Sequence, residues 1–207
     1  MAGFFISFEG IDGSGKSTQA RLVAEALRTA GHGVTLTREP GGSAGAEDIR
    51  RLVLEGATDR WSAETEILLF TAARRDHVEK TIRPALARGD VVISDRFADS
   101  TRVFQGITRG DLTATVDTLH DLMIGLEPDV TLLFDLDPAV GLARATARAG
   151  AEMRFEDMGL AFQTRARAGF LTLAAAHPRF RVIDGARPPD LVAADALAQV
   201  LAAMGAR

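Results

Sequence analysis

The stretch Phe8-Glu-Gly-Ile-Asp-Gly-Ser-Gly-Lys-Ser-Thr18 contains the pattern Gly10-x-x-x-x-Gly15-Lys16-Ser17. It follows the apolar run Phe4–Phe8 and leads into a helical pattern, so a strand, a loop and a helix are expected in succession. In such a loop, backbone N–H groups point inward at phosphate oxygens, and the start of the helix adds its positive end. The sequence therefore predicts a binding site for a nucleoside triphosphate.

Two side chains of this loop have distinct expected roles. Lys16 brings a positive charge to the β- and γ-phosphates, and Ser17 offers a hydroxyl to Mg²⁺. Lys16 and Lys80 are the only two lysines of the chain, which otherwise uses arginine. A lysine at the position where phosphate binding needs a compact ammonium therefore indicates a functional residue. The alternative, a glycine-rich turn that matches the pattern by accident, disagrees with the strand–loop–helix context. The predicted ATP-binding residues are Gly10, Ile11, Asp12, Gly13, Ser14, Gly15, Lys16, Ser17 and Thr18.

Apolar, β-branched runs alternate with helical patterns along the 207 residues. The strand-like runs are Phe4–Phe8, Val34–Thr37, Val91–Ser94, Val130–Asp135 and Phe180–Ile183. The helical patterns run from Ser17 to a cap at Gly31, over 63–83 with a kink or restart at Pro84, and over 112–126, 138–148, 156–176 and 190–204. This alternation predicts an α/β fold, a parallel five-stranded sheet with helices on both faces, in one domain over residues 1–207.

Composition and charge argue against a nucleic-acid-binding, a secreted or a membrane-spanning protein. A net charge of -4 gives no sign of a nucleic-acid surface. The chain has no cysteine, which suits a cytoplasmic enzyme and leaves no thiolate metal site. We expect neither a signal peptide nor a membrane span, because a strand starts almost at once and no apolar run is long enough. The expected partners are therefore small molecules rather than nucleic acid or membrane.

Charged residues come directly after two of the expected strands. Arg38 and Glu39 follow the second strand, and Asp95 and Arg96 follow the third. Ligands of parallel sheets bind at the carboxyl ends of the strands, so these side chains should lie near the phosphates. The planar fork of an arginine suits a second phosphate, and two phosphate sites side by side are typical of a nucleotide kinase. Asp95 is a candidate to hold Mg²⁺ through water, and a structural ion pair with Arg96 is the alternative.

Candidates for a base-binding site lie on the long helical segment over 63–83 and in the stretch that follows Asp95 and Arg96. Phe70 and Arg74 are four residues apart and share one helix face, where a ring can stack on a base and a guanidinium can donate to it. On periodicity alone, a core position is the more common explanation for such a phenylalanine. Thr101 and Gln105 repeat the same spacing beside Ser100, either to contact a base edge or simply to decorate a helix.

Two segments have the composition of loops. Residues 38–43 form a turn after a strand, and residues 149–157 are small, charged and glycine-containing, as in an exposed mobile loop. Arg144, Arg148 and Arg154 flank or lie in this loop, so a lid over about 144–157 is expected to bring arginine to the transferring phosphoryl group. A solvated, arginine-rich helix end is the alternative.

Taken together, these motifs resemble the thymidylate kinase family. They are the Phe8–Thr18 loop, Thr37-Arg-Glu-Pro-Gly-Gly42, Leu69-Phe-Thr-Ala-Ala-Arg74, Ser94-Asp-Arg-Phe-Ala-Asp-Ser-Thr101, Gln105-Gly106 and the arginine-bearing lid. They occur in the family's order and spacing over nearly the whole chain. The resemblance implies a P-loop NTPase nucleotide-kinase fold and the transfer of a phosphoryl group from ATP with Mg²⁺ to dTMP, in dTTP synthesis.

The resemblance also implies roles for single residues. Phe70 would stack on thymine, Arg74 would bond the base, and Arg38 and Arg96 would hold the dTMP phosphate. The implied catalytic residues are Lys16, Arg96, Arg148 and Arg154, and the implied metal-site residues are Ser17 and Asp95. The implied dTMP-binding residues are Asp12, Arg38, Glu39, Pro40, Phe70, Arg74, Arg96, Ser100, Thr101, Phe104 and Gln105. Gly13 occupies a loop position that is basic in some members, so the chain is similar to the lid-arginine type.

One departure from the family and two alternatives stay open. Phe104 stands where many bacterial members have a tyrosine that is thought to crowd the sugar 2′ position. The first alternative is a kinase whose acceptor is another nucleotide or a deoxynucleoside. The second is a regulatory module that binds nucleotide without an acceptor. Paired Arg38 and Arg96 argue against the last alternative. Family members are commonly homodimers, and residues 112–126 are apolar enough for an interface, although a core helix has the same pattern.

Overall fold

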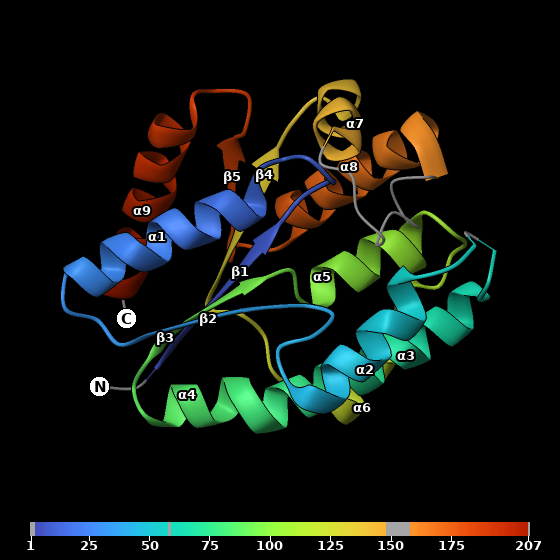
Figure 1. The fold of residues 1–207 in the computed structure, drawn as a ribbon, viewed down its shortest axis with the longest axis horizontal. Helices are drawn as coiled ribbons and strands as arrows, with labels where there is room; N and C mark the ends of the chain where they lie inside the picture. Colours follow the sequence, from blue (N-terminus) through green and yellow to red (C-terminus); the bar gives the residue numbers. More distant parts are fainter. Residues whose placement is uncertain (1–2, 58, 148–157, 207) are drawn as a thin grey trace.

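The computed structural model describes residues 3–57, 59–147 and 158–206 (Figure 1). Its centre is a five-stranded sheet in the order β2-β3-β1-β4-β5, with every neighbouring pair parallel. The strands are β1 (Phe4–Glu9), β2 (Val34–Arg38), β3 (Val91–Asp95), β4 (Val130–Asp135) and β5 (Phe180–Asp184). The predicted parallel sheet is confirmed, and each strand ends at the predicted residue or one residue beyond it.

Helical segments connect the strands. They are α1 (Lys16–Thr29), α2 (Ala44–Leu54), α3 (Ala63–His77), α4 (Arg83–Ala87), α5 (Ala98–Thr101), α6 (Thr113–Met123), α7 (Pro138–Thr146), α8 (Gly159–Ala176) and α9 (Pro189–Gly205). Two π-helical segments, η1 (Val78–Ile82) and η2 (Arg102–Ile107), continue α3 and α5. No helix within the described ranges is both long and apolar enough to cross a membrane.

The predicted kink at Pro84 takes the form of a π-helical segment. A proline inside a helix removes one N–H donor, and its ring crowds the carbonyl four residues earlier. Here η1 ends at Ile82, two residues before Pro84, and the helix continues directly into α4. The segments α3, η1 and α4 therefore follow one another without an intervening loop.

Two segments were not predicted from the sequence. The turn over 38–43 is followed by α2, which was not expected, and Asp95 is soon followed by α5 and η2. The apolar pattern of α2 is weak, because only Ala46 and Val53 are fully buried along this helix. Both segments matter for function, because they carry side chains into the cleft described below.

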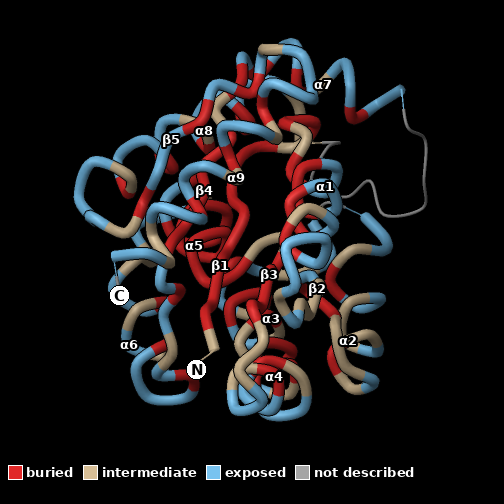
Figure 2. The backbone as a smooth tube through the Cα atoms, turned by 90° about the vertical axis from the view of Figure 1, so that its left-hand side faces the viewer, coloured by how far each residue is buried: buried red, intermediate tan, exposed pale blue. Residues whose placement is uncertain are grey.

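Helices cover both faces of the sheet because successive side chains of a strand point to opposite sides. Phe4, Ile6 and Phe8 of β1 pack with α1 and α9 on one face. Phe5 packs on the other face with η1 and α4, and a further cluster joins β4 and β5 to α8 and η2. The central strands are accordingly the most deeply buried part of the chain (Figure 2).

The loop after β1 packs closely against α7. Gly13 has a positive φ of 74°, and a Cβ atom there would lie 1.9 Å from the backbone oxygen of Gly141. On the other side of the contact, a Cβ atom on Gly141 would lie 2.6 Å from the backbone oxygen of Asp12. Neither neighbour is a flexible side chain, so this contact needs glycine on both segments. It fixes the position of the loop relative to the helix after β4.

Gly141→Ala should therefore destabilise the protein, although alanine favours helices. Backbone atoms must move to admit the methyl group, and overpacking of this kind costs about 1–3 kcal/mol. Gly205→Ala is the matched control, because no atom lies within 4 Å of its added Cβ atom. Urea unfolding measures both, and the control should be neutral or stabilised by up to about 1 kcal/mol. An equal free energy of unfolding for the two variants would contradict the close contact.

Candidate functional site

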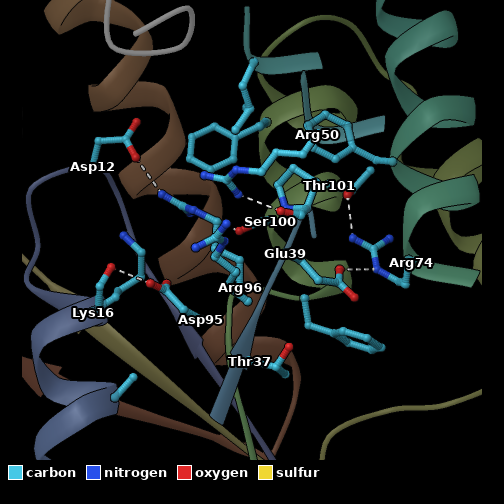
Figure 3. Close-up of a pocket in the computed structure, with 18 of the residues that line it drawn as sticks. Asp12, Lys16, Thr37, Glu39, Arg50, Arg74, Asp95, Arg96, Ser100 and Thr101 are labelled. Carbon is cyan, nitrogen blue, oxygen red and sulfur yellow. Dashed lines mark hydrogen bonds and ion pairs between the residues drawn. The ribbon is translucent and has the colours of Figure 1, made fainter. Parts of the chain in front are cut away.

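A cleft of about 600 Å³ opens at the carboxyl ends of β1, β2 and β3 (Figure 3). The predicted residues that line it are Asp12, Gly13, Gly15, Lys16, Ser17, Arg38, Glu39, Pro40, Phe70, Arg74, Asp95, Arg96, Ser100, Thr101, Phe104 and Gln105. The predicted ATP-binding residues Gly10, Ile11, Ser14 and Thr18 belong to the same loop but are not among the lining residues. One continuous cleft thus brings together the loop and the charged residues after β2 and β3.

The loop end of the cleft holds a buried lysine. Nζ of Lys16 donates to the backbone oxygen of Ile11 at 2.7 Å and to Oγ of Ser14 at 3.3 Å. Burial, followed by the positive charge of Arg96, lowers the pKa of Lys16 to about 8. A group of phosphate oxygens supplies the negative charge that would favour the ammonium form again. Gly15 has a positive φ of 92° and is the N-cap residue of α1. The amino end of α1 therefore lies at the loop end of the cleft, beside Lys16.

Ser17, on α1, and Asp95, at the end of β3, lie in contact. The Ser17 hydroxyl donates to the Asp95 carboxylate, which ends β3. A hydroxyl and a carboxylate are the hard oxygen donors that Mg²⁺ prefers, and this ion commonly takes one or two protein ligands and completes its shell with phosphate and water. No group of three His, Cys, Asp or Glu residues within the described segments suits a metal. The pair therefore fits a nucleotide-bound Mg²⁺ rather than a site built from protein ligands alone.

Arg96 occupies the middle of the cleft. Its Nη2 donates to Oδ1 of Asp12 at 2.6 Å, and its Nη1 donates to the backbone oxygen of Gly10 and to Oγ of Ser100, both at 3.0 Å. Its guanidinium carbon lies 5.0 Å from the centre of the Phe104 ring. Among the described residues other than glycine, Arg96 alone has a positive φ, at 72°. Such a conformation is costly, so the surrounding contacts must hold it.

Asp12 is the counterion of this arginine. Burial by itself raises the pKa of a carboxyl group, but the positive charges of Arg96 and Lys16 outweigh it and lower the pKa of Asp12. Its second oxygen, Oδ2, accepts a hydrogen bond of 2.9 Å from Nε2 of Gln163 on α8. Sequence analysis missed Gln163, a fully buried polar residue. The signal available was one amide side chain at helical spacing with Ala166 and Phe170, on an otherwise apolar helix face.

Two arginines lie on the side of the cleft formed by β2 and α2. Arg38 is exposed and forms an ion pair of 3.1 Å with Glu47. Arg50, on α2, donates from Nη1 to the backbone oxygen of Pro40 at 2.6 Å and also lines the cleft. Sequence analysis missed Arg50 because it missed α2. The residues predicted after β2 therefore share this part of the cleft with a helix-borne arginine.

The far end of the cleft contains a buried ion pair. Nε of Arg74 donates to Oε2 of Glu39 at 2.7 Å, and Nη2 donates to Oγ1 of Thr101 at 3.0 Å. Burial would raise the pKa of Glu39, but the charge of Arg74 and then the hydrogen bond from His77 lower it. Phe70, one turn before Arg74 on α3, is largely buried and lines the same space. The prediction that these two side chains share one site is confirmed in geometry.

Gln105 and Phe104 are held by neighbours outside the cleft. Nε2 of Gln105 donates to Oε2 of the buried Glu66 at 3.0 Å, which fixes the orientation of the amide. The Phe104 ring stacks on Phe162 at 5.8 Å and meets Phe170 edge-on at 5.7 Å. Phe104 therefore packs against two aromatic rings, and the bulk of its own ring stays at the cleft wall.

The predicted lid lies largely outside the described residues. Arg148 and Arg154 belong to residues 148–157, so their positions remain predictions. Arg144 is described, and its Nη1 approaches the backbone oxygen of Gly185 at 3.5 Å. It is not among the residues that line the cleft.

Comparisons with known proteins agree with this geometry. Residues 8–196 match the family model for thymidylate kinase. A solved structure of thymidylate kinase from Ehrlichia chaffeensis superposes with a TM-score of 0.77 and 36% identity, covering 97% of this chain and 99% of that one. The predicted α/β fold of the P-loop NTPase class is therefore confirmed.

Curated relatives are similar over nearly their whole length. The thymidylate kinase of Ruegeria pomeroyi is 70% identical over 96% of this chain and 95% of its own length. That of Dinoroseobacter shibae is 66% identical over 97% of this chain and 98% of its own length. With a family model over most of the chain and relatives this similar, the chain belongs to the thymidylate kinase family.

Proposed function

We propose that the protein transfers the γ-phosphoryl group of ATP to dTMP, giving ADP and dTDP, a step of dTTP synthesis. Family membership supports the reaction. The observation that carries the site assignment is one cleft with Lys16 and the loop at one end and the Arg74–Thr101 contact at the other, with Arg96 between them. Phosphates of a donor and an acceptor would meet at Arg96.

The mechanism we propose is direct in-line transfer without a covalent enzyme intermediate. An acceptor phosphate oxygen is already a nucleophile, so the site needs no strong general base. Catalysis then rests on positioning and on stabilisation of charge. Lys16 at the loop end of the cleft and Arg96 in its middle would share the charge of the transferring group. Arg148 and Arg154 are proposed as further catalytic arginines of the lid over about 144–157.

The proposed acceptor site uses the far end of the cleft. Phe70 would stack on thymine, and Arg74 would donate to a base oxygen while Glu39 and Thr101 hold it in place. Arg38 and Arg96 would hold the phosphate. The remaining residues proposed to contact dTMP are Asp12, Pro40, Ser100, Phe104 and Gln105, and Arg50 joins them from α2.

We also propose that the reaction uses Mg²⁺, with the Ser17 hydroxyl as a ligand and Asp95 holding the ion through water. The contact between these two oxygen groups supports this, because both are hard donors at the phosphate end of the cleft. When bound, the ion neutralises charge on the phosphate oxygens. ADP release that persists in excess chelator would contradict the proposal.

A panel of acceptors tests the function itself. ADP release from ATP and Mg²⁺ is followed in a coupled assay with dTMP, dUMP, UMP, AMP, CMP, GMP or thymidine as the acceptor. A strong preference for dTMP is expected. Preference for a different monophosphate would keep the kinase and remove the assignment of Phe70 and Arg74 to thymine. Nucleotide binding without turnover on any acceptor would support a regulatory module instead.

Lys16→Ala should abolish transfer, with kcat reduced by at least about 100-fold. The variant removes the one lysine at the loop end of the cleft, and no other described side chain occupies its place between Ile11 and Ser14. Single alanine variants of Arg148 and Arg154 should each cost less, since either of them would serve the transferring group. The coupled assay measures all three variants, and an active Lys16→Ala protein would refute the site assignment.

Arg74→Ala should mainly raise the KM for dTMP, by about tenfold or more, because a charge-assisted hydrogen bond to the base is lost. The KM for ATP should change little. Arg88→Ala is the matched control, since Arg88 is exposed and pairs with Asp90 away from the cleft. Steady-state kinetics measure both variants. If the KM for dTMP stays unchanged in Arg74→Ala, Arg74 lies outside the base site.

We further propose a homodimer that associates through α3 and α6. Leu68 on α3 and Leu122 and Met123 on α6 are exposed apolar residues. Arg75 lies on the same face of α3 as Leu68 and donates to the backbone oxygen of Met123 at 2.7 Å, so the two helices present neighbouring surfaces. A single domain over 1–207 and a cytoplasmic location, where ATP is available, complete the proposal.

Leu122→Asp should convert the dimer to a monomer, because it places a charge in an apolar interface. Leu201→Asp on α9 is the matched control, since Leu201 is also an exposed leucine on a helix. Sedimentation velocity over a range of protein concentrations distinguishes the two states. A wild-type protein that is monomeric at every concentration would refute the dimer, and a dimeric Leu122→Asp protein would place its interface elsewhere.

A further inference from the structure

Glu9 is a fully buried carboxylate at the end of β1, directly before the phosphate-binding loop. It does not line the cleft, so nothing above gives it a role. A buried charge is costly unless its hydrogen bonds are satisfied. Oε1 of Glu9 accepts a hydrogen bond of 2.7 Å from the backbone N–H of Phe97, and Oε2 accepts one of 2.6 Å from the hydroxyl of Ser100.

Both partners of Glu9 are connected to Arg96. Phe97 is the next residue in the chain, so its anchored N–H constrains the peptide that follows Arg96. The Ser100 hydroxyl accepts a hydrogen bond of 3.0 Å from Nη1 of Arg96 while it donates to Glu9. One contact therefore acts on the backbone of Arg96 and the other on its guanidinium. Arg96 needs such support because its φ of 72° is unfavourable for a residue with a side chain.

We infer that Glu9 is a positioning residue, which holds the turn over 96–100 so that the Arg96 guanidinium faces the acceptor phosphate. The inference rests on the role proposed above for Arg96. It assigns the carboxylate a task that an amide cannot perform. Both groups that face Glu9 are donors, and only an ionised carboxylate offers two acceptors with no donor of its own.

A glutamine at this position would turn one NH₂ group toward Phe97 N–H or toward Ser100. Phe97 N–H cannot accept, so the amide oxygen must stay there and the NH₂ group must meet the Ser100 oxygen. That oxygen can accept a second hydrogen bond beside the one from Arg96, but the Ser100 hydrogen loses its Glu9 acceptor and the hydroxyl must turn to find another. The link between Ser100 and Arg96 is then the one that weakens, whereas the loop and the base end of the cleft are untouched.

The charges around Glu9 make ionisation of this group sensitive to pH. They belong to Asp99 on α5, Arg96 after β3 and Lys16 on α1, with Arg102 and Arg179 holding Asp99. Burial, and then Asp99, raises the pKa of Glu9 to about 7, and Arg96 opposes the rise. A carboxyl whose pKa is raised on folding loses stabilisation as pH rises from its unfolded value of 4.5 toward 7. The ionised form thus serves the position of Arg96 at a cost in stability.

The experiment compares Glu9→Gln with the wild-type enzyme at pH 8. Calorimetry gives the Kd for dTMP and for thymidine, and the coupled assay gives kcat and both KM values. We expect the Kd for dTMP to rise about 10- to 100-fold, while the Kd for thymidine, which lacks the phosphate, and the KM for ATP stay within about twofold. The Tm should be unchanged or higher, since a neutral amide replaces a buried charge. A purely structural role for the two hydrogen bonds predicts a lower Tm and equal losses for both ligands.

Asp129→Asn is the matched control. Oδ2 of Asp129 accepts a hydrogen bond of 2.8 Å from the backbone N–H of Phe5, at the other end of β1. The variant therefore also replaces a carboxylate that binds a backbone N–H. This variant should bind dTMP as the wild type does. The ratio of the two Kd values for dTMP, Glu9→Gln over wild type, should fall toward one below pH 7. Titration of the dTMP phosphate itself affects both proteins and cancels in this ratio.

The outcomes separate this inference from the proposed site. If Arg96→Ala binds dTMP normally, the role of Arg96 fails. If Arg96→Ala loses dTMP affinity while Glu9→Gln keeps it, or if thymidine and dTMP weaken equally in Glu9→Gln, the inference about Glu9 is wrong. Should Glu9→Gln not fold, Glu9→Asp keeps the charge but shortens the side chain, so that it cannot keep both hydrogen bonds, to Phe97 N–H and to the Ser100 hydroxyl. It must then show the loss for dTMP and not for thymidine, and equal losses overturn the inference.

Discussion

The ion pair between Arg96 and Asp12 is the constraint on which the cleft depends. Asp12 belongs to the loop after β1, and Arg96 follows β3, so the pair ties two neighbouring strand ends together. Arg96 contacts Asp12 from a backbone conformation with positive φ, and the contacts of Phe97 and Ser100 support this conformation. The glycine contact between the loop and α7 holds the loop from the other side. The middle of the cleft is thus fixed by interactions that need no ligand.

Three arginines of the cleft each have a carboxylate partner, and this arrangement explains why they can be concentrated in one place. Arg38 pairs with Glu47, Arg74 with Glu39, and Arg96 with Asp12. The partners reduce repulsion between the arginines and hold the long side chains in defined positions before a ligand arrives. Less side-chain entropy is then lost on binding. The cost is competition, because a phosphate must share each arginine with a carboxylate that is already bound.

Much of this arrangement follows from the sequence by simple rules. Two central strands were predictable because Val91–Ile93 and Val130–Phe134 are continuously apolar or β-branched, as expected for strands covered on both faces. The carboxyl-end rule then placed Arg38 and Arg96 in the cleft without knowledge of the sheet order. Arg50 and Gln163 were not predictable in this way. Arg50 depends on the course of α2, and Gln163 meets Asp12 from 151 residues further along the chain. A local pattern carries no information about either contact.

Burial of the ion pairs changes along the cleft in step with the charge of the proposed ligand. At the base end, Arg74 and Glu39 are both almost fully buried, and together they present no net charge to a neutral base. At the phosphate end, Arg96 and Asp12 keep some exposure, Arg38 and Glu47 keep more, and Lys16 adds a cation. A buried unpaired charge would penalise thymine, whereas partly hydrated pairs can exchange a carboxylate for a phosphate. The same residue type therefore serves a neutral and an anionic group in one cleft, and the difference lies in how deeply each counterion is buried.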